Sequence, residues 1–469
     1  MATPYGILGA PRERSTSIVR AASLSTFRDA FSGEVVLPED PDYDRARSVW
    51  NGLVDRRPAL VARCAGVDDV RLTVRLAREQ ALPLAVRCGG HSLAGFSTCD
   101  DGVVLDLSPM RDVTVDPERR TARVAGGTLL SQLDAAAQEY GLVCPVGVVG
   151  HTGVAGLTLG GGMGRLQRHF GFSIDNLRSV ELVTADDRVL TVSADEEPEL
   201  FWGMRGAGAN FGVVTSFEFA LHDMGPVVTQ GFVDFPAERA PEIAARVREY
   251  LETAPDEVMV SFGVTFGAPE DGELAGRPIV FVGATHSGRT EEAEDALRPL
   301  RDLGPVTDTF RRVNYVALQT SGDEDMAWGK RFYMKGAFLA ELSDAFVDAA
   351  VANATTPLGA ITLWAHGGAV SRVPEDAMAF TGRSAACWLG VEADWTQPSD
   401  DARLIDWGRT TMEALKPFTA SGHYVNDVIE TGRDVVRGIY GEAKYERLVA
   451  LKRRFDPDNV FRLNQNIEP

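Results

Sequence analysis

Apolar and polar positions in the first quarter of the chain follow the pattern of a strand–helix–strand unit. Short apolar runs typical of buried strands occupy 60–66, 82–87 and 103–107. Between the first two runs, apolar residues recur with the spacing of one helix face, as at Val70 and Val74. The pattern therefore predicts a strand, a helix and two further strands.

Two hairpins, a helix and a closing strand follow this unit. Residues 113–127 and 177–193 each contain two alternating apolar and polar runs separated by turn residues, which is the pattern of a β-hairpin. Residues 128–140 have helical periodicity, and 212–221 form another apolar run. We therefore expect a mixed α and β domain in this part of the chain.

The pattern changes near residue 224, where longer strand candidates alternate with helices. The expected strands, rich in Val, Phe and Trp, are 228–235, 257–267, 278–285, 360–368 and 386–393. The expected helices are 239–253, 290–302, 342–353 and 402–415. A few long strands of this kind favour one antiparallel sheet with helices on one face.

These changes divide the chain into four parts. The N-terminal residues have little pattern, so we expect a loosely ordered arm, with order beginning near Glu34. The C-terminal part has one clear helix, at 442–454, and is too short to fold alone, so it is expected to pack on the first domain. The expected parts are an arm at 1–33, a first domain at 34–223, a second domain at 224–418 and a C-terminal segment at 419–469.

Composition and charge narrow the classes of function. The formal net charge of −20 would repel nucleic-acid backbones and anionic membrane surfaces, so neither is expected as a partner. The five cysteines form no C-x-x-C pair, so we expect no metal site, and reduced thiols favour a cytoplasmic protein. No signal peptide is expected, and no apolar run is long enough to span a membrane.

A short turn with two glycines follows the second predicted strand. It consists of Arg87, Cys88, Gly89, Gly90, His91 and Ser92. Successive glycines let backbone N–H groups point inward and form an anion-binding nest, which would suit a pyrophosphate. His91 would then face the bound group. The alternative is a histidine that only hydrogen-bonds within the turn.

Two further segments are rich in small residues. Residues 147–164 contain eight glycines in 18 positions, and we expect them to form neither a helix nor a packed strand. The absence of the G-x-G-x-x-G and G-x-x-x-x-G-K-[ST] phosphate motifs disfavours a nicotinamide-binding unit or an ATPase. Residues 205–212 form a third small-residue loop. Three such turns predict that the first domain wraps a long ligand along bare main chain.

Four motifs in this order resemble one enzyme family. They are RCGGHS (87–92), GVAGLTLGGGMGRLQRHFGFSIDNL (153–177), ELFWGMRGAGANFGVVT (199–215) and FDPDNVFRLNQNI (455–467). From about residue 36 to the C-terminus, the chain resembles the berberine-bridge-enzyme-like FAD-linked oxidases of the vanillyl-alcohol-oxidase superfamily. The resemblance implies a two-lobed α+β fold of the FAD-binding PCMH type, with an antiparallel-sheet substrate domain covered by helices.

The resemblance also implies how the cofactor is held. The histidine of the GGH turn, His91, would bond to the 8α-methyl group of FAD. Many relatives carry a second bond from a cysteine, but that position falls at Val149, so a single covalent bond is predicted. A looped-out alignment would instead place Cys144 there. In oxidases of this group a small aliphatic residue often lies near the flavin. The resemblance places Thr152 at this position, and because threonine departs from that pattern, oxygen reactivity stays open.

The other residues that the resemblance assigns to the cofactor are mostly glycines and amides. They are Arg87, Cys88, Gly89, Gly90, Ser92, Val149, Thr152, Gly153, Gly156, Gly160, Gly161, Gly162, Gly164, Gly212, Val213, Asn464 and Asn466. The two asparagines match a terminal N-x-N that lies against the flavin ring, and their amides can both donate and accept hydrogen bonds.

A Tyr-x-Asn stretch contains the candidate acid–base residues. Tyr424 and Asn426 match the family, but Asp427 occupies the fourth position, which is the base in some relatives. Two candidates stay open: Tyr424, if nearby positive charge lowers its pKa, and Asp427, if burial raises its pKa. The alternative for Asp427 is that it caps the following turn.

Aromatic residues of the second domain are candidates for its core or for a substrate pocket. They are Trp364, Trp388, Trp395, Phe332 and Tyr333, with Lys335 and His366 as further pocket candidates.

Together, the residues and the resemblance predict an FAD-dependent oxidase. A hydride from a small alcohol, sugar, amine or secondary metabolite would pass to the flavin, and oxygen would take the electrons to give hydrogen peroxide. The alternatives are a dehydrogenase that uses another acceptor and a flavin-carrying binding protein without turnover. The pattern names neither the substrate nor the oligomeric state, because fold alone does not determine function.

Overall fold

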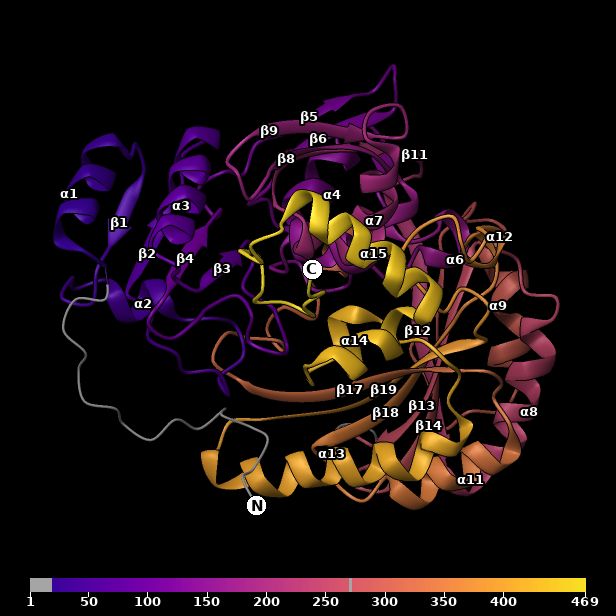
Figure 1. Ribbon diagram of the computed structural model, residues 1–469. Coiled ribbons are helices and arrows are strands. Elements are labelled where there is room, and N and C mark those ends of the chain that lie inside the picture. Colours follow the sequence, from indigo (N-terminus) through magenta and orange to yellow (C-terminus); the bar gives the residue numbers. More distant parts are fainter. Residues whose placement is uncertain (1–18, 270–271) are drawn as a thin grey trace.

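The first lobe begins with a four-stranded sheet that ends in the first glycine turn. The computed structural model describes residues 19–269 and 272–469, and this sheet has the order β1-β2-β4-β3 (Figure 1). The strands are β1 (Glu34–Val36), β2 (Leu60–Arg63), β3 (Leu84–Arg87) and β4 (Val103–Asp106). Both β2 and β3 pair with β4 in parallel, and these three strands are almost entirely buried, as their apolar runs predict.

A five-stranded antiparallel sheet completes the first lobe, in the order β5-β6-β10-β8-β9, and it contains both predicted hairpins. Its strands are β5 (Val113–Asp116), β6 (Thr121–Ala125), β8 (Leu177–Val183), β9 (Val189–Ser193) and β10 (Val213–Ala220). The short strands β7 (Leu142–Val143) and β11 (His222–Asp223) pair separately. The helices here include α2 (Tyr43–Arg47), α3 (Val67–Glu79), α4 (Leu130–Gln138) and α6 (Gln167–Phe170).

The second lobe is built on one antiparallel sheet, which confirms the predicted fold class. Its order is β15-β12-β14-β13-β18-β19-β17, with β16 also paired to β12. The strands are β12 (Val227–Pro236), β13 (Val258–Phe266), β14 (Pro278–His286), β15 (Thr307–Asp308), β16 (Arg311–Asn314), β17 (Arg331–Leu339), β18 (Gly359–Ala365) and β19 (Cys387–Trp395). The edge strand β17 was not among the expected strands, because Lys335 and Gly336 interrupt its apolar run; its pairing with β19 along nine residues stabilises it.

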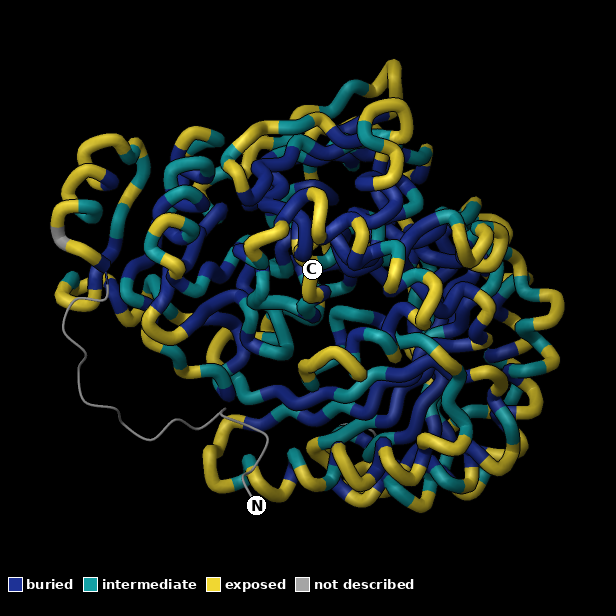
Figure 2. Tube along the Cα trace, viewed as in Figure 1, coloured by how far each residue is buried: buried dark blue, intermediate teal, exposed yellow. Residues whose placement is uncertain are grey.

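Helices cover one face of this sheet, while the other face turns toward the first lobe (Figures 1 and 2). Apolar residues of α8 (Ala240–Leu251), α9 (Ala293–Arg301), α11 (Asp344–Asn353) and α13 (Asp401–Leu415) share a buried cluster with the outward residues of the strands, such as Leu389 and Val391. The neighbouring Trp388 belongs to the core between the lobes. Two short helices, α10 (Tyr315–Gln319) and α12 (Ala369–Arg372), lie at connections.

The expectation of a loosely ordered arm before Glu34 is wrong for the described residues. Residues 21–30 form α1 (Ala21–Ala30), and Phe27 is buried in the cluster that also contains Val70 and Val74 of α3. The helix was missed because its sequence has few apolar residues, and contact with α3 stabilises it. Residues 1–18 of the expected arm lie outside the described residues.

The expectation that no helix forms within 147–164 is also wrong. Residues Val154–Gly160 form α5, although two of its seven residues are glycines. Val154 and Leu159 are buried in the core, and the helix packs against α7 (Pro198–Ala207), so tertiary contacts outweigh its low intrinsic propensity. The predicted loop at 205–212 is likewise the kinked end of α7 followed by a 3₁₀ turn at Gly208–Asn210.

The C-terminal residues return to the first lobe, where the chain ends between the two lobes (Figure 1). The helices α14 (Arg433–Tyr440) and α15 (Glu442–Phe455) bury Ile439 and Leu448, respectively, in the same core as Trp202 of α7. At the C-terminal end of α15, Lys452 of the last turn and Asp456 just beyond it form a fully buried ion pair, with Nζ of Lys452 2.7 Å from the carboxylate. Nζ also donates to the carbonyl of Asn210, which fixes the tail beside the 3₁₀ turn.

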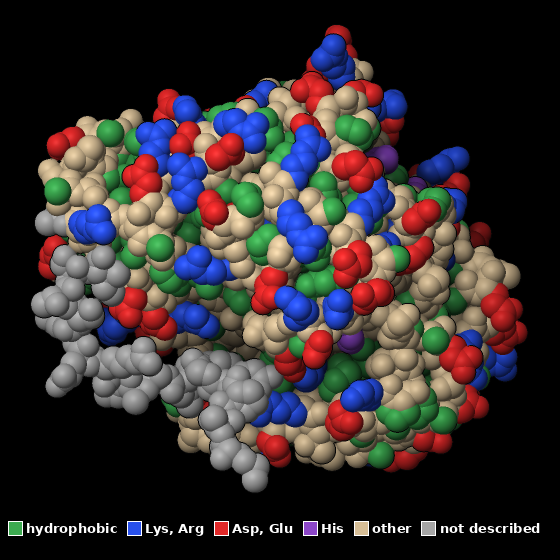
Figure 3. Space-filling model, in the orientation of Figure 1, with side chains coloured by type: hydrophobic (Ala, Val, Ile, Leu, Met, Phe, Trp, Pro, Cys, Tyr) green, Lys and Arg blue, Asp and Glu red, His purple; other side chains and the backbone are tan. Residues whose placement is uncertain are grey.

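Acidic and basic side chains are mixed over the face of the molecule in Figure 3. Within 19–269 and 272–469, no helix combines the length and the apolar character needed to cross a bilayer.

Candidate functional site

A cavity of about 400 Å³ lies where the first lobe, the C-terminal tail and the edge of the large sheet meet. Its wall is formed by the glycine turn after β3, by α5, by the 3₁₀ turn after α7 and by the tail near Asn464. The second lobe contributes Met326 and Phe332, and the C-terminal segment contributes the stretch from Tyr424 to Val428. All three small-residue segments found in the sequence therefore meet at one cavity.

Most of the residues singled out in the sequence line this cavity. They are Cys88, Gly89, Gly90, His91, Ser92, Val149, Thr152, Gly153, Gly156, Gly160, Gly212, Val213, Tyr424, Asp427 and Asn464. The predicted residues that are not part of the lining are Arg87, Gly161, Gly162, Gly164 and Asn466.

Three of the predicted residues outside the lining, Arg87, Gly161 and Gly162, pack behind residues that form the cavity wall. Arg87 is buried below the glycine turn, where it donates to Asp106 at 2.7 Å and to the carbonyl of Ser48. Gly161 has φ +144°, which suits glycine, and a Cβ there would lie 2.7 Å from Phe380. The N–H of Gly162 donates to the hydroxyl of Tyr424.

The main chain of the glycine turn is free to bind an anion. The backbone N–H groups of residues 90–94 donate no hydrogen bond to any described residue. Among the described lining residues there is no lysine or arginine, so a diphosphate group here would rely on main-chain N–H groups. Gly156 of α5 faces the cavity. Apart from its own helix, no described residue has an atom within 4 Å of the place where a Cβ would lie, so a ligand can approach the helix backbone closely.

Two side-chain amides of the tail present unused acceptors at the same cavity. Asn464 donates to the carbonyl of Ala209 at 2.8 Å, and Gln465 donates to the carbonyl of Val428 at 2.6 Å. The oxygens of both amides are buried and have no hydrogen-bond partner among the described residues. Buried acceptors of this kind are costly unless a ligand or water donates to them.

His91 is held in a rigid aromatic setting at the cavity wall. Its ring stacks on Trp50 at 4.7 Å between centroids, and its Nε2 lies 2.7 Å from Nδ1 of His151. Its Nδ1 lies 3.4 Å from the hydroxyl of Thr152. Burial, with a smaller contribution from His151, lowers the pKa of His91 to about 3, so the imidazole is neutral at ordinary pH.

Asp427 is a buried carboxyl group at the same cavity. The indole N–H of Trp388 donates to it at 2.5 Å. Within 19–269 and 272–469 no backbone N–H donates to its carboxylate, so Asp427 does not cap the following turn, contrary to the alternative considered from the sequence. Burial raises the pKa of Asp427 to about 8, opposed by the bond from Trp388 and assisted by the charge of Glu392.

The hydroxyl of Tyr424 accepts hydrogen bonds from neutral groups, and no lysine or arginine is among the groups that shift its pKa. Its hydroxyl accepts from the N–H of Gly162 at 3.1 Å and from the amide of Asn426 at 2.9 Å. Burial nevertheless raises the pKa of Tyr424 to about 12, so the phenol stays protonated at ordinary pH and offers no phenolate to accept a proton.

The aromatic candidates of the second lobe divide between cavity and core. Phe332 lines the cavity, and Trp388 lies directly behind Asp427. Tyr333 and Trp395 belong to a separate buried cluster. Of the two polar candidates, Lys335 forms an ion pair with Glu430, and His366 is buried against Phe172 and Phe338, away from the lining.

Several lining residues were not identified from the sequence. Trp50, Met326 and Gln465 line the cavity, and the indole N–H of Trp50 donates to the carbonyl of Met326. Trp50 and Met326 lie far from every motif, so no local signal marks them. Gln465 stands between the two predicted asparagines, Asn464 and Asn466. The direction of the tail backbone decides which side chains face inward, so Asn464 and Gln465 line the cavity and Asn466 does not.

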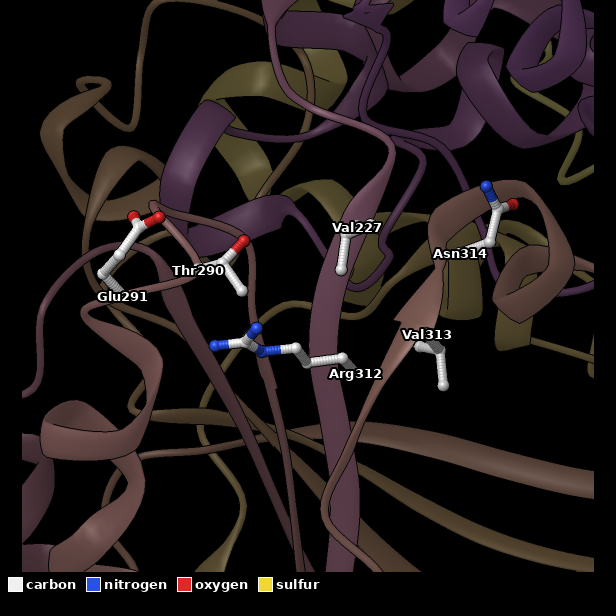
Figure 4. A pocket seen from close by; sticks show the side chains of 6 residues that line it. All are labelled: Val227, Thr290, Glu291, Arg312, Val313 and Asn314. Carbon is white, nitrogen blue, oxygen red and sulfur yellow. The ribbon is translucent and has the colours of Figure 1, made fainter.

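A second hollow, of about 450 Å³, lies at the far edge of the large sheet (Figure 4). It is lined by Val227, Thr290, Glu291, Arg312, Val313 and Asn314, and the Arg312 side chain extends toward Thr290 and Glu291. None of the residues singled out in the sequence lies there, and within the described residues no group of His, Cys, Asp and Glu is placed to hold a metal ion.

Two family descriptions match the two ends of the site. Residues 58–193 match the family described as FAD binding domain, and 423–468 match the family described as berberine and berberine like. The first range contains the glycine turn and α5, and the second contains Tyr424, Asp427 and the tail, so the two matches together contain most of the cavity wall.

Characterised proteins resemble the chain over almost its whole length. It is 32% identical to (R)-6-hydroxynicotine oxidase of Paenarthrobacter nicotinovorans, covering 94% of this chain and 97% of that protein. The crystal structure of 6-hydroxy-D-nicotine oxidase from Arthrobacter nicotinovorans matches with a TM-score of 0.84 and 31% identity, covering 94% and 98%. A carbohydrate oxidase from Microdochium nivale, solved with a substrate analogue, matches with a TM-score of 0.83 and 25% identity, covering 96% and 100%.

Proposed function

Because this chain belongs to the berberine-bridge-enzyme-like family of FAD-linked oxidoreductases, we propose that it holds FAD through one covalent bond to His91 and oxidises a small organic substrate with dioxygen as acceptor. FAD would accept a hydride from the substrate and pass two electrons to dioxygen, which gives hydrogen peroxide. The observation that carries this proposal is a neutral, rigidly stacked His91 imidazole at the wall of a glycine-lined cavity.

The residues present suit FAD along the whole cavity. The free N–H groups of residues 90–94 would bind the diphosphate, and Gly156 leaves room for the ligand beside α5. The unused oxygens of Asn464 and Gln465 would accept hydrogen bonds from the cofactor.

A single bond through His91 is supported by the positions of the cysteines. Val149 lines the cavity where many relatives have a bonding cysteine, whereas Cys144 is fully buried and lies outside the lining. Burial raises the pKa of the Cys144 thiol far above its usual value, so it carries no nucleophilic thiolate. Cys88 lines the cavity, but burial raises the pKa of its thiol to about 11, and it donates to the carbonyl of Thr128.

We assign the acid–base step to Asp427. Hydride loss from an alcohol or amine carbon requires a group that accepts the proton of the neighbouring O–H or N–H. Asp427 faces the cavity and has a pKa near the working range of an enzyme, whereas the pKa of Tyr424 is about 12. Trp388 would hold the carboxyl group in place, and Tyr424 would help shape the cavity between Gly162 and Asn426.

The proposed substrate class and electron acceptor come from the names of the relatives. One relative is named for a hydroxynicotine and another is a carbohydrate oxidase, so we propose an alcohol, sugar, amine or related metabolite. Oxygen is the proposed acceptor because both are named as oxidases; with Thr152 in the lining, a dehydrogenase that uses another acceptor is the alternative.

All five cysteines are free thiols, which supports a cytoplasmic location.

Replacing His91 with Ala tests the linkage. Denatured wild-type protein should keep a yellow flavin, and peptide mapping by mass spectrometry should find it on the His91 peptide. Denatured His91→Ala protein should release all its FAD into acid, because the proposal assigns the bond to His91 alone. A Cys144→Ala variant serves as control and should keep its flavin.

Flavin on the Cys144 peptide would refute the single histidyl bond. Substrate bleaching of the yellow colour separates an enzyme from a flavin-carrying binding protein, and peroxide formation in air separates an oxidase from a dehydrogenase.

A further inference from the structure

Two histidines from different segments of the first lobe meet beside the cavity. Nε2 of His91, in the glycine turn after β3, lies 2.7 Å from Nδ1 of His151, which precedes α5. Nε2 of His151 faces the backbone carbonyl of Asp323 at 3.5 Å. His91, His151 and Asp323 therefore form a chain of hydrogen-bonding groups that leads from the cavity wall into the second lobe.

The direction of these hydrogen bonds follows from the carbonyl at the end of the chain. A carbonyl oxygen only accepts, so Nε2 of His151 is the donor to Asp323. In a neutral imidazole the other nitrogen is then the acceptor, so Nδ1 of His151 accepts from Nε2–H of His91. This arrangement leaves Nδ1 of His91 without a proton.

The unprotonated nitrogen of His91 is also the one that the surroundings leave available. The contact of Nδ1 with the hydroxyl of Thr152, which lines the cavity, is long at 3.4 Å, whereas Nε2 is engaged with His151 at 2.7 Å. Stacking on Trp50 and an edge contact from Trp328 fix the plane of the ring. Nδ1 is therefore the nucleophilic atom of this histidine.

We propose that His151 is the positioning residue for covalent attachment of the cofactor: it holds His91 as the Nε2–H tautomer and accepts that proton when Nδ1 forms the bond. This inference rests on the proposed histidyl linkage to FAD. In the step, the 8α-methyl group loses a proton, Nδ1 of His91 bonds to that carbon, and the electron pair of the broken C–H bond enters the flavin. The two released protons balance the two electrons gained by the flavin, and dioxygen then reoxidises it to give hydrogen peroxide.

The second lobe takes part because Asp323 sets the orientation of His151. One carboxylate oxygen of Asp323 accepts from the N–H of Gly150 at 2.7 Å, directly beside His151. The same segment is tied to the first lobe by the bond from the Trp50 indole to Met326 and by the bond from the N–H of Gly329 to Trp50. Attachment of the cofactor thus requires the two lobes to be docked.

The test follows attachment in protein made without flavin. The full chain is produced in a riboflavin-auxotrophic host, FAD is added, and two quantities are measured: reversible FAD binding by fluorescence quenching, and the rate at which flavin becomes stable to acid. His151→Ala should bind FAD with nearly wild-type affinity but attach it roughly 100-fold more slowly, the usual contribution of a proton acceptor. Added imidazole should accelerate attachment in this variant, an effect that a merely structural role would not produce.

A matched variant separates the two tasks of His151. In His151→Asn, the amide oxygen can accept from Nε2–H of His91 but takes up no proton, so attachment should be faster than in His151→Ala and slower than in wild type. Attachment at the wild-type rate in His151→Ala would overturn the proposal. Wild-type protein that releases its flavin into acid would instead refute the histidyl linkage itself, so the two failures are distinguishable.

Substitutions of Asp323 test whether the second lobe contributes to attachment of the cofactor. Asp323→Ala loses the bond to the N–H of Gly150 and should slow attachment roughly fivefold, the value of one lost hydrogen bond. Asp323→Asn keeps an accepting oxygen and should attach FAD at close to the wild-type rate. Equal rates in wild type and Asp323→Ala would show that the second lobe plays no part.

Discussion

At the scale of single residues, the site depends on burial that changes the charge state of ordinary side chains. His91 is neutral because burial lowers its pKa to about 3, and Asp427 is largely protonated at neutral pH because burial raises its pKa to about 8. The indole of Trp388 donates to the carboxylate of Asp427 and partly opposes that rise. His91 thus has the neutral form that its proposed role needs at ordinary pH, whereas Asp427 gains the carboxylate form that its proposed role needs only as the pH rises through about 8.

Replacing Asp427 with Asn should remove the proton acceptor of the reaction. Only the carboxylate form can accept a proton, so kcat/KM of the wild type should rise as pH increases through about 8. Asp427→Asn should lower kcat/KM roughly 100-fold and abolish that rise. The measurement is the pH profile of peroxide production.

Tyr424→Phe is the control for this prediction. It removes the hydroxyl that accepts from Gly162 and Asn426 but leaves the carboxyl group of Asp427 intact, so the rise with pH should persist. A rise through about 8 that survives in Asp427→Asn would assign the proton acceptor to another group.

At the scale of elements, α5 shows how a glycine-rich segment becomes a helix with a bare face. Its apolar residues Val154 and Leu159 pack into the core, while Gly156 points to the cavity, and Gly160 lies against Asn426. Glycine weakens an isolated helix. Here the missing side chain of Gly156 leaves space for a ligand, and the missing side chain of Gly160 leaves space for Asn426.

Gly156→Ala should therefore separate folding from cofactor binding. Alanine is the better helix former by roughly 0.5–1 kcal/mol. Apart from its own helix, no described residue lies within 4 Å of the new methyl group, so the flavin-free protein should be at least as stable as wild type. The methyl group would occupy cofactor space, and overpacking of this kind should weaken reversible FAD binding roughly tenfold. Thermal unfolding and fluorescence titration measure the two effects.

Gly438→Ala is the matched control, because Gly438 is an exposed helical glycine of α14 with no atom within 4 Å of a built Cβ. It should gain the same stability without any change in FAD affinity. Unchanged affinity in Gly156→Ala would mean that the cofactor does not lie against this face of α5.

At the scale of the whole molecule, buried polar contacts hold the lobes together around the cavity. Arg383 of the second lobe is 1% exposed and forms a bidentate ion pair with Asp175 of the first lobe. Arg168, also buried, donates from the first lobe to the carbonyls of Val258 and Ala254. A buried charge without its partner is costly, so these contacts specify one docked arrangement of the lobes.

Arg383→Met should therefore destabilise the protein strongly. It leaves the carboxylate of Asp175 buried without its cation, which should lower the free energy of unfolding by about 3–5 kcal/mol. Arg372→Met breaks an ion pair with Asp256 in which the arginine side chain is 61% exposed, and should cost at most about 1 kcal/mol. Urea unfolding followed by tryptophan fluorescence compares the two, and equal losses would contradict the role assigned to Arg383.

The sequence by itself determined the features that depend on the local pattern of residues. Alternating apolar positions predicted both hairpins of the first lobe and most strands of the large sheet, because backbone geometry repeats over a few residues. Four motifs, from the glycine turn at 87–92 to the terminal stretch at 455–467, resemble FAD-linked oxidases, and the comparisons confirm an FAD-linked oxidoreductase family. Such motifs are local because main-chain contact with a cofactor favours small residues at those positions.

Only the tertiary structure decided the features that depend on distant partners. The partner of His91 is 60 residues away, that of Asp427 is 39 away, and Trp50 meets Met326 across 276 residues. No local periodicity encodes such contacts, so the tautomer of His91 and the raised pKa of Asp427 follow only from the packed lobes. The same packing turned a glycine-rich segment into α5, because burial of its apolar residues outweighs a helix propensity that is local.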